Sequence, residues 1–123
     1  MKDFVLNLDY YEVLNLHKAL LEAKFNMYPD NELVSGSPLV ADVYIQVREL
    51  LIQSDEAESW GEWFQLRNRP DFKERAFMRM KKNKRWTGAS LDEKKEIAKS
   101  YLAPFIYDEA ELNEVVTEMD ERT

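Results

Sequence analysis

Apolar residues recur at intervals of three and four along two stretches of the chain, which is the spacing of an amphipathic helix. The first stretch predicts a helix from about Tyr10 to Met27, ended by Pro29. Its pattern lasts only about two heptads, so we expect it to pack within its own chain rather than form a coiled coil. The apolar positions are Val13, Leu16, Leu20, Ala23 and Met27, widened by Leu14, Leu21 and Phe25.

The second stretch predicts a helix from about Pro38 to Gln53 that is apolar around most of its circumference. Such a helix usually lies at the centre of a fold. We therefore expect this helix to form the core, with Val47 and Leu51 fully buried. Its main stripe consists of Val40, Val43, Tyr44, Val47, Leu50 and Leu51.

Helix starts are marked by side chains that can cap free backbone N–H groups. In a capping box, Ser or Asp precedes the helix and Glu follows three residues later. Ser37 before Pro38 is a further start, because proline favours the first helical position. The four pairs that fit a capping box are Asp9 with Glu12, Asp55 with Glu58, Ser90 with Glu93, and Asp108 with Glu111.

These starts, together with the prolines, predict four later helices. The third is short, the fourth follows Pro70, the fifth ends before Pro104, and the sixth frays into an acidic tail from about residue 119. The third contains Trp60, Trp63 and Phe64, and the fourth runs from about Asp71 to Lys84.

Residues 4–8 have the composition of a short strand, but no second strand is predicted to pair with them. We expect an extended lead-in that packs on the core, and a polar loop from Asn31 to Gly36. The sequence thus predicts an all-α fold, with residues 1–123 forming a single compact bundle of five to six helices. The length of 123 residues fits one such domain.

Composition excludes several chemistries. The chain has no cysteine, which removes disulfides, thiolate nucleophiles and the usual structural zinc sites. It shows neither a signal-peptide pattern nor the ~20 consecutive apolar residues that span a bilayer. We therefore expect a cytoplasmic protein without a membrane segment.

Catalytic motifs are equally sparse. His17 is the only histidine, and it lies in the middle of the apolar arc of the first helix, so we interpret it as a structural residue rather than a buried acid–base group. The three glycines are isolated, which excludes a glycine-rich phosphate loop. No segment has the spacing of a metal site, and the glutamates at 109–118 fit a solvated helix face. We expect no enzyme activity, cofactor or metal, although an enzyme built on carboxylates and a metal stays a third, less favoured class.

Charge is distributed unevenly along the chain. Residues 67–86 hold 9 bases and 2 acids, whereas the chain as a whole has a net charge of −7. The acidic total opposes general affinity for DNA. Within the basic block, Arg75, Arg79 and Lys82 are spaced four and three, so they are predicted to share one outward face of the fourth helix, which Trp86 would extend. The alternative is that this face is neutralised by the protein's own acidic helices.

Arginine and tryptophan dominate binding hot spots, so the basic block and the nearby tryptophan cluster are the candidate contact surface. We expect a non-enzymatic interaction protein, such as a small regulator, adaptor or inhibitor, that binds a protein partner. The alternative is an RNA- or DNA-binding module that uses residues 67–86. In such a module an aromatic ring would stack on the bases and the cations would contact the phosphates. The oligomeric state is left open. The candidate contact residues are Arg67, Arg69, Arg75, Arg79, Lys82, Trp86 and Trp63.

Overall fold

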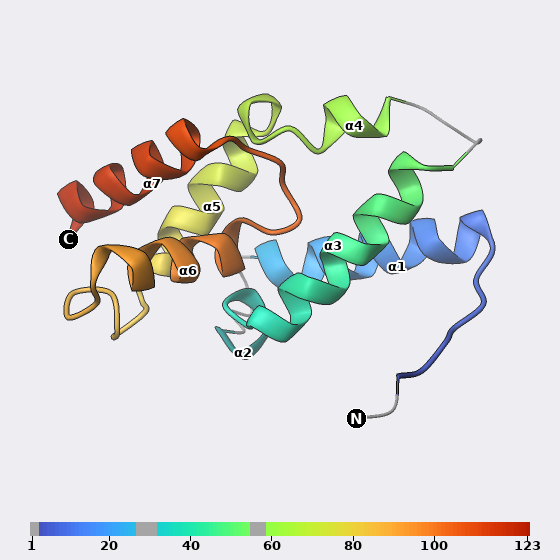
Figure 1. Ribbon diagram of the computed structural model, residues 1–123, viewed down its shortest axis with the longest axis horizontal. Coiled ribbons are helices and arrows are strands. Elements are labelled where there is room, and N and C mark those ends of the chain that lie inside the picture. The colour runs from blue at the N-terminus through green and yellow to red at the C-terminus, as the bar shows by residue number, and fades with distance from the viewer. Residues whose placement is uncertain (1–2, 27–31, 55–58) are drawn as a thin grey trace.

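The computed structural model describes residues 3–26, 32–54 and 59–123. Within these ranges the chain forms seven α-helices and one turn of 3₁₀ helix, so the predicted all-α fold is confirmed (Figure 1). The longer helices are α1 (Tyr10–Phe25), α3 (Pro38–Ile52), α5 (Pro70–Met80), α6 (Leu91–Leu102) and α7 (Glu109–Arg122). The short ones are α2 (Glu32–Ser35), α4 (Trp60–Trp63) and the 3₁₀ helix η1 (Leu66–Asn68).

The helix starts follow the capping chemistry of the sequence. The Asp9 carboxylate accepts a hydrogen bond from the backbone N–H of Glu12 at 2.8 Å, and the Glu12 carboxylate accepts one from Asp9 at 3.1 Å. Reciprocal bonds of the same kind open α6 at Ser90 and α7 at Asp108. Three of the four predicted capping boxes are therefore confirmed. The fourth, Asp55 with Glu58, lies outside the described residues.

The long helices form two groups. Figure 1 shows α1 crossing α3 on one side of the molecule, while α5, α6 and α7 gather on the other side. The segment between α6 and α7 runs into the space between the groups and returns. There Ile106 makes a parallel bridge with Gln65, in which its N–H donates to the carbonyl of Phe64 and its carbonyl accepts from the N–H of Leu66, both at 2.9 Å.

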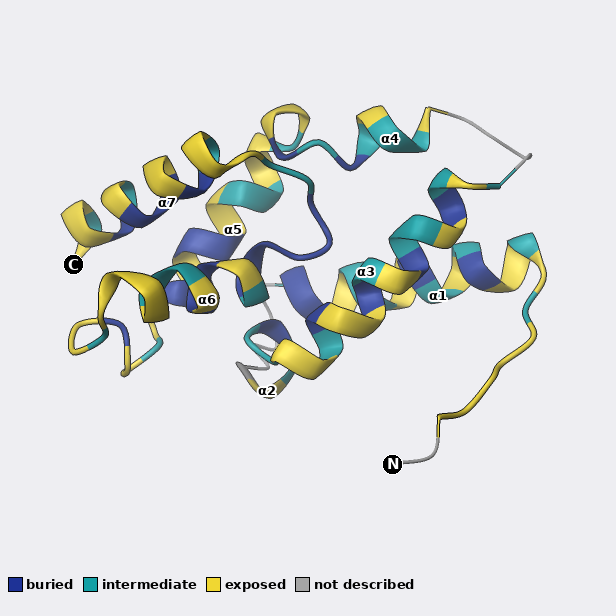
Figure 2. Ribbon diagram, in the orientation of Figure 1, coloured by how far each residue is buried: buried dark blue, intermediate teal, exposed yellow. Residues whose placement is uncertain are grey.

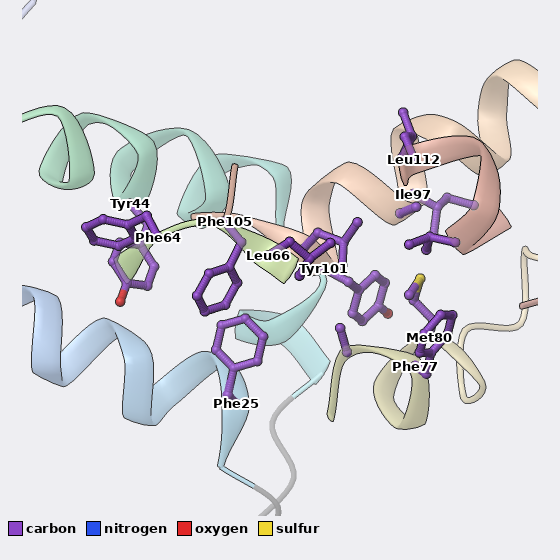
Figure 3. Packing of buried hydrophobic residues seen from close by; sticks show 14 of the residues in the cluster. Phe25, Tyr44, Phe64, Leu66, Phe77, Met80, Ile97, Tyr101, Phe105 and Leu112 are labelled. Carbon is purple, nitrogen blue, oxygen red and sulfur yellow. The ribbon is translucent and has the colours of Figure 1, made fainter. Parts of the chain in front are cut away.

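Aromatic rings join the two groups at the centre of the core. Figure 3 shows the rings of Phe25, at the end of α1, and Phe105, after α6, facing one another. Their centroids are 5.5 Å apart. The face of α3 turned toward α1 includes Val47 and Leu51, which are 4 % and 0 % exposed, so their predicted burial is confirmed. Val43 and Leu50 belong to the same predicted stripe but are exposed, because α3 is covered on one side only.

Three local predictions are wrong. The lead-in does not pack on the core: Phe4, Val5 and Leu6 are exposed, and only Leu8 contacts it. Part of the expected polar loop forms the short helix α2. The expected frayed tail is helical through Arg122, since Met119 is buried and Arg122 pairs with Glu74 and Glu118.

Helix α5 ends at Met80, four residues earlier than expected. The N–H of Asn83 donates to the carbonyl of Met80, and the side chain of Asn83 accepts from the N–H of Arg85, both at 2.9 Å. Such local side-chain bonds compete with helix continuation. Residues 81–85 therefore form a turn. None of the described helices combines the length and hydrophobicity that crossing a bilayer requires.

Candidate functional site

Helix α5 does not present the predicted basic stripe as one surface. Arg75 and Lys82 are exposed, but Arg79 is only 1 % exposed, so the prediction that it faces outward is wrong. The reason is that α5 packs against both α1 and α6, and Arg79 lies on the covered side of the helix, whereas Asp71, Glu74, Arg75 and Met78 lie on its exposed side. Arg75 lies against the aromatic core, with its guanidinium 5.3 Å from the ring of Phe72.

Trp86 is also not part of a surface, contrary to the prediction. It is 1 % exposed, and its indole N–H donates to the carboxylate of Asp120 at 2.9 Å. The ammonium group of Lys94 pairs with the same carboxylate at 2.9 Å and lies 5.7 Å from the Trp86 ring. Trp86 therefore fastens the end of α7 to the turn before α6.

The acids of α7 pair with bases that lie outside the basic block. Asp120 pairs with Lys94, Glu109 pairs with Lys95, and Glu118 pairs with Arg122. These partners come from α6 and from α7 itself. These ion pairs therefore do not support the alternative in which acids of the last helix neutralise the cations of residues 67–86.

Four cations of the block are exposed together in the turn after α5, which we call the basic turn. Positive charge is favourable there, since the C-terminal end of a helix carries partial negative charge. The basic turn contains no acid within its own residues. Its charged members are Lys81, Lys82, Lys84 and Arg85.

Two other predicted contact residues, Trp63 and Arg69, meet at the opposite end of α5, around a surface hollow of about 490 Å³ between α4 and η1. We call it the aromatic hollow, because two tryptophans from α4 form its apolar wall. Its polar rim includes one cation and one acid. The lining residues are Ser59, Trp60, Glu62, Trp63, Asn68 and Arg69.

Arg69 is held in place over Trp63. Its Nε–H donates to the carbonyl of Trp63 at 3.0 Å, and its guanidinium lies 4.4 Å from the centre of the Trp63 ring. A further N–H donates to the carbonyl of Asn68 at 3.3 Å. Arg67 is exposed beside it and donates to Gln65. The structure thus brings together two of the predicted residues, Trp63 and Arg69.

Beneath the hollow, His17 is enclosed by aromatic rings. The rings of Trp60, Trp63 and Phe64 lie 5.1–5.5 Å from its centroid. Its Nδ1 is 2.6 Å from the hydroxyl of Tyr44, which also lies 3.1 Å from the carbonyl of His17. One tautomer satisfies both contacts: Nδ1–H donates to the Tyr44 oxygen, whose own hydrogen is donated to the carbonyl. His17 is therefore buried and hydrogen-bonded to a neighbour.

Burial, with a smaller contribution from the nearby Lys18, lowers the pKa of His17 from its usual 6.5 to about 4. In the unfolded chain the imidazole takes up a proton near pH 6.5, whereas in the folded protein it stays neutral down to about pH 4. The unfolded state thus binds more protons in this window, and stability falls as the pH falls through it.

We expect this single histidine to cost about 3 kcal/mol of stability between pH 6.5 and pH 4. His17→Gln should lower the free energy of unfolding by about 1–2 kcal/mol at pH 7, and remove this part of the acid sensitivity. Urea unfolding of both proteins between pH 4 and 7 measures the difference. Parallel pH profiles for the two proteins would contradict the assignment.

Lys24 is a buried cation on the same helix. Its ammonium donates to the carbonyl of Ser35 at 2.9 Å and to that of Ser100 at 2.8 Å, which joins the ends of α2 and α6 to α1. Burial lowers its pKa from 10.5 to about 8. The sequence signal for this position was its place in the apolar arc, seven residues after His17.

Two other hollows border α6. One of about 410 Å³ includes Arg85 of the basic turn and Tyr101, and the other, of about 550 Å³, lies toward α3 and includes Arg48 and Tyr107. Among the described residues, no three histidine or carboxylate side chains gather where a metal ion would bind. The aromatic hollow and the basic turn are the features that contain exposed residues of the predicted contact surface.

No protein-family model matches this sequence, and comparisons with curated proteins and with solved structures find no similar protein.

Proposed function

We propose that this chain is a non-enzymatic interaction protein, acting in the cytoplasm as a small regulator, adaptor or inhibitor, and that it binds a protein partner through the aromatic hollow. The observation that carries the proposal is the fixed pair of Arg69 and Trp63. Arginine and tryptophan are the residues most enriched among binding hot spots. A guanidinium already held by two carbonyls loses little conformational freedom when a partner arrives.

The hollow offers a partner two kinds of contact. Trp60 and Trp63 supply an apolar wall, while Arg69 supplies N–H donors at its edge, and the exposed Arg67 lies two residues before it in the chain. A partner segment that inserts an apolar side chain and carries an acid beside it matches both. Glu62 on the same rim accepts a hydrogen bond from the side-chain amide of Asn68 and limits the positive charge, which favours a short mixed segment over a uniformly acidic one.

The test is capture of a partner from native cells by the tagged protein. Arg67→Ala combined with Arg69→Ala should reduce capture by about tenfold or more, as expected for the loss of a hot spot worth at least ~1.4 kcal/mol. A matched control removes two exposed cations elsewhere, Lys18→Ala with Lys99→Ala, and should capture normally. Thermal unfolding of both double variants shows whether each remains folded at the capture temperature.

Full capture by a folded Arg67→Ala, Arg69→Ala variant would contradict the proposal. Capture that falls equally in the Lys18→Ala, Lys99→Ala control would point to a general effect of charge, and would contradict it as well.

A second candidate function, nucleic-acid binding, is favoured by the clustering of four exposed cations in the basic turn. Trp86 is buried and cannot stack on a base, so this candidate relies on phosphate contacts alone. Nuclease treatment before capture should then abolish binding. The affinity should also fall steeply with salt, with a log–log slope near −0.7 per phosphate contact on a single strand and near −0.9 on duplex DNA.

A further inference from the structure

The first described residues form an extended arm that stands away from the helices. Phe4, Val5 and Leu6 are 93 %, 87 % and 76 % exposed, although all three are apolar. Leu8 packs against the core and fixes the base of the arm, just before the cap of α1. Figure 2 shows the arm as an exposed strip that leaves the body of the molecule. We call residues 3–8 the N-terminal arm.

Helix α3 carries an apolar stripe on the side that α1 does not cover. Leu39, Val43 and Leu50 are 77 %, 49 % and 53 % exposed. At 100° per residue, all three fall within a narrow arc of the helix, with the exposed Gln46 between them. In Figure 2 this side of α3 is largely exposed along its first turns. We call these three residues the α3 stripe.

The dimensions of the arm and the stripe agree. In an extended chain, side chains two residues apart, such as Phe4 and Leu6, are separated by about 7 Å. On a helix, residues four apart, such as Leu39 and Val43, are separated by about 6 Å along the axis. Leu8 stays on its own core, so residues 3–7 are the part that can reach another copy; these five extended residues span about 17 Å, and the stripe from Leu39 to Leu50 is about 16 Å long. One arm therefore suffices to cover one stripe.

We infer that two copies of this chain associate by exchanging their N-terminal arms, each arm lying on the α3 stripe of the other copy. Within one chain, the arm and the stripe both remain in solvent. A two-fold contact between identical chains covers both features twice, because each copy supplies one arm and one stripe. A second copy is therefore an occupant that carries an exposed apolar segment of the length of the stripe.

The net charge of the chain predicts how the affinity of the two copies for each other changes with salt. Each copy has a net charge of −7, so two copies repel each other at low ionic strength. Screening by salt reduces that repulsion, and apolar contacts are not weakened by it. The dimer should therefore become tighter as salt rises, the opposite of the response expected for binding to phosphate.

Sedimentation analysis over a range of concentrations, at low and high salt, tests the inference. The wild-type protein should sediment as a dimer whose dissociation constant falls with salt. An arm variant, Phe4→Ser with Leu6→Ser, and a stripe variant, Leu39→Ser with Val43→Ser, should each be monomeric. Leu91→Ser, at an exposed leucine of α6, is the control and should dimerise normally.

Mixing the two variants separates exchange between copies from other arrangements. The arm variant keeps an intact stripe and the stripe variant keeps an intact arm, so a mixed pair regains one of the two contacts. The mixture should show dimers that neither variant forms alone. Circular dichroism should show native helix content in both variants, since all four positions are exposed.

Three results would overturn the inference. One is a wild-type protein that stays monomeric at every concentration and salt. Another is a dimer that survives in the arm variant, which would mean that stripes pack on each other. The third is a mixture of monomeric variants that stays monomeric, which would point to an arm that folds onto its own helix.

Discussion

Replacing Leu51 with alanine is expected to lower the free energy of unfolding by about 2–5 kcal/mol, the range for removing a buried leucine side chain. Leu51 is 0 % exposed and lies on the face of α3 that packs against α1, with Val47 one turn before it. Removing its three outer carbon atoms leaves a cavity that rigid helices close only in part. A domain of this size has about 5–15 kcal/mol of stability in total, so the loss is a large share.

Urea unfolding followed by circular dichroism measures this loss, and Leu91→Ala is the matched control. Leu91 is the first residue of α6 and is largely exposed, so its truncation should change stability by no more than about 0.5 kcal/mol. A loss below about 0.5 kcal/mol for Leu51→Ala would show that α3 does not form the core as described.

Arg79→Glu is expected to be the second most damaging change, lowering the free energy of unfolding by about 3–5 kcal/mol. Arg79 is 1 % exposed and lies on the side of α5 that also buries Ala76 and Met80. The substitution places a carboxylate of opposite sign where a guanidinium has been accommodated, and moves it out of water. A buried charge in surroundings arranged for the opposite sign is among the few causes of such large effects.

The control for Arg79→Glu is Arg75→Glu, one helical turn earlier. Arg75 is exposed, so reversing its charge should cost little more than about 0.5 kcal/mol, apart from its contact with Phe72. Thermal and urea unfolding of both variants make the comparison. Equal stability of the two variants would contradict the burial of Arg79.

The same pair of residues shows where sequence reasoning reaches its limit. Helical spacing correctly places Arg75 and Arg79 near one another on α5, since periodicity is a property of the helix itself. It does not show how many sides of that helix other elements cover. Helix α5 is covered by both α1 and α6, and one arginine of the two is buried as a result. For α3 the opposite holds: the pattern predicts a helix that is buried on most sides, but Val43 and Leu50 of its six-residue stripe are exposed.

Features that depend on neighbouring residues were predictable. The capping boxes at Asp9, Ser90 and Asp108 involve groups three residues apart, and the structure forms them. The juxtaposition of Trp63 and Arg69 was signalled by their closeness in sequence. The burial of Trp86 was not, because its partner Asp120 is 34 residues away and belongs to a helix whose docking the sequence does not specify.

The way in which α1 is anchored has a consequence for synthesis of the chain. Phe25 packs on Phe105, and Lys24 donates to the carbonyl of Ser100. The packing of the end of α1 is therefore complete only after the last quarter of the sequence has been synthesised. About 50 residues separate the end of α3 from Phe105. At ribosomal rates of 5–20 residues per second, the α1–α3 pair exists for about 3–10 seconds before Phe105 is made, and in that time only Phe72, whose ring lies 5.4 Å from that of Phe25, can cover Phe25. During those seconds the nascent chain presents the kind of apolar surface that chaperones bind, and Phe105 removes it when it emerges.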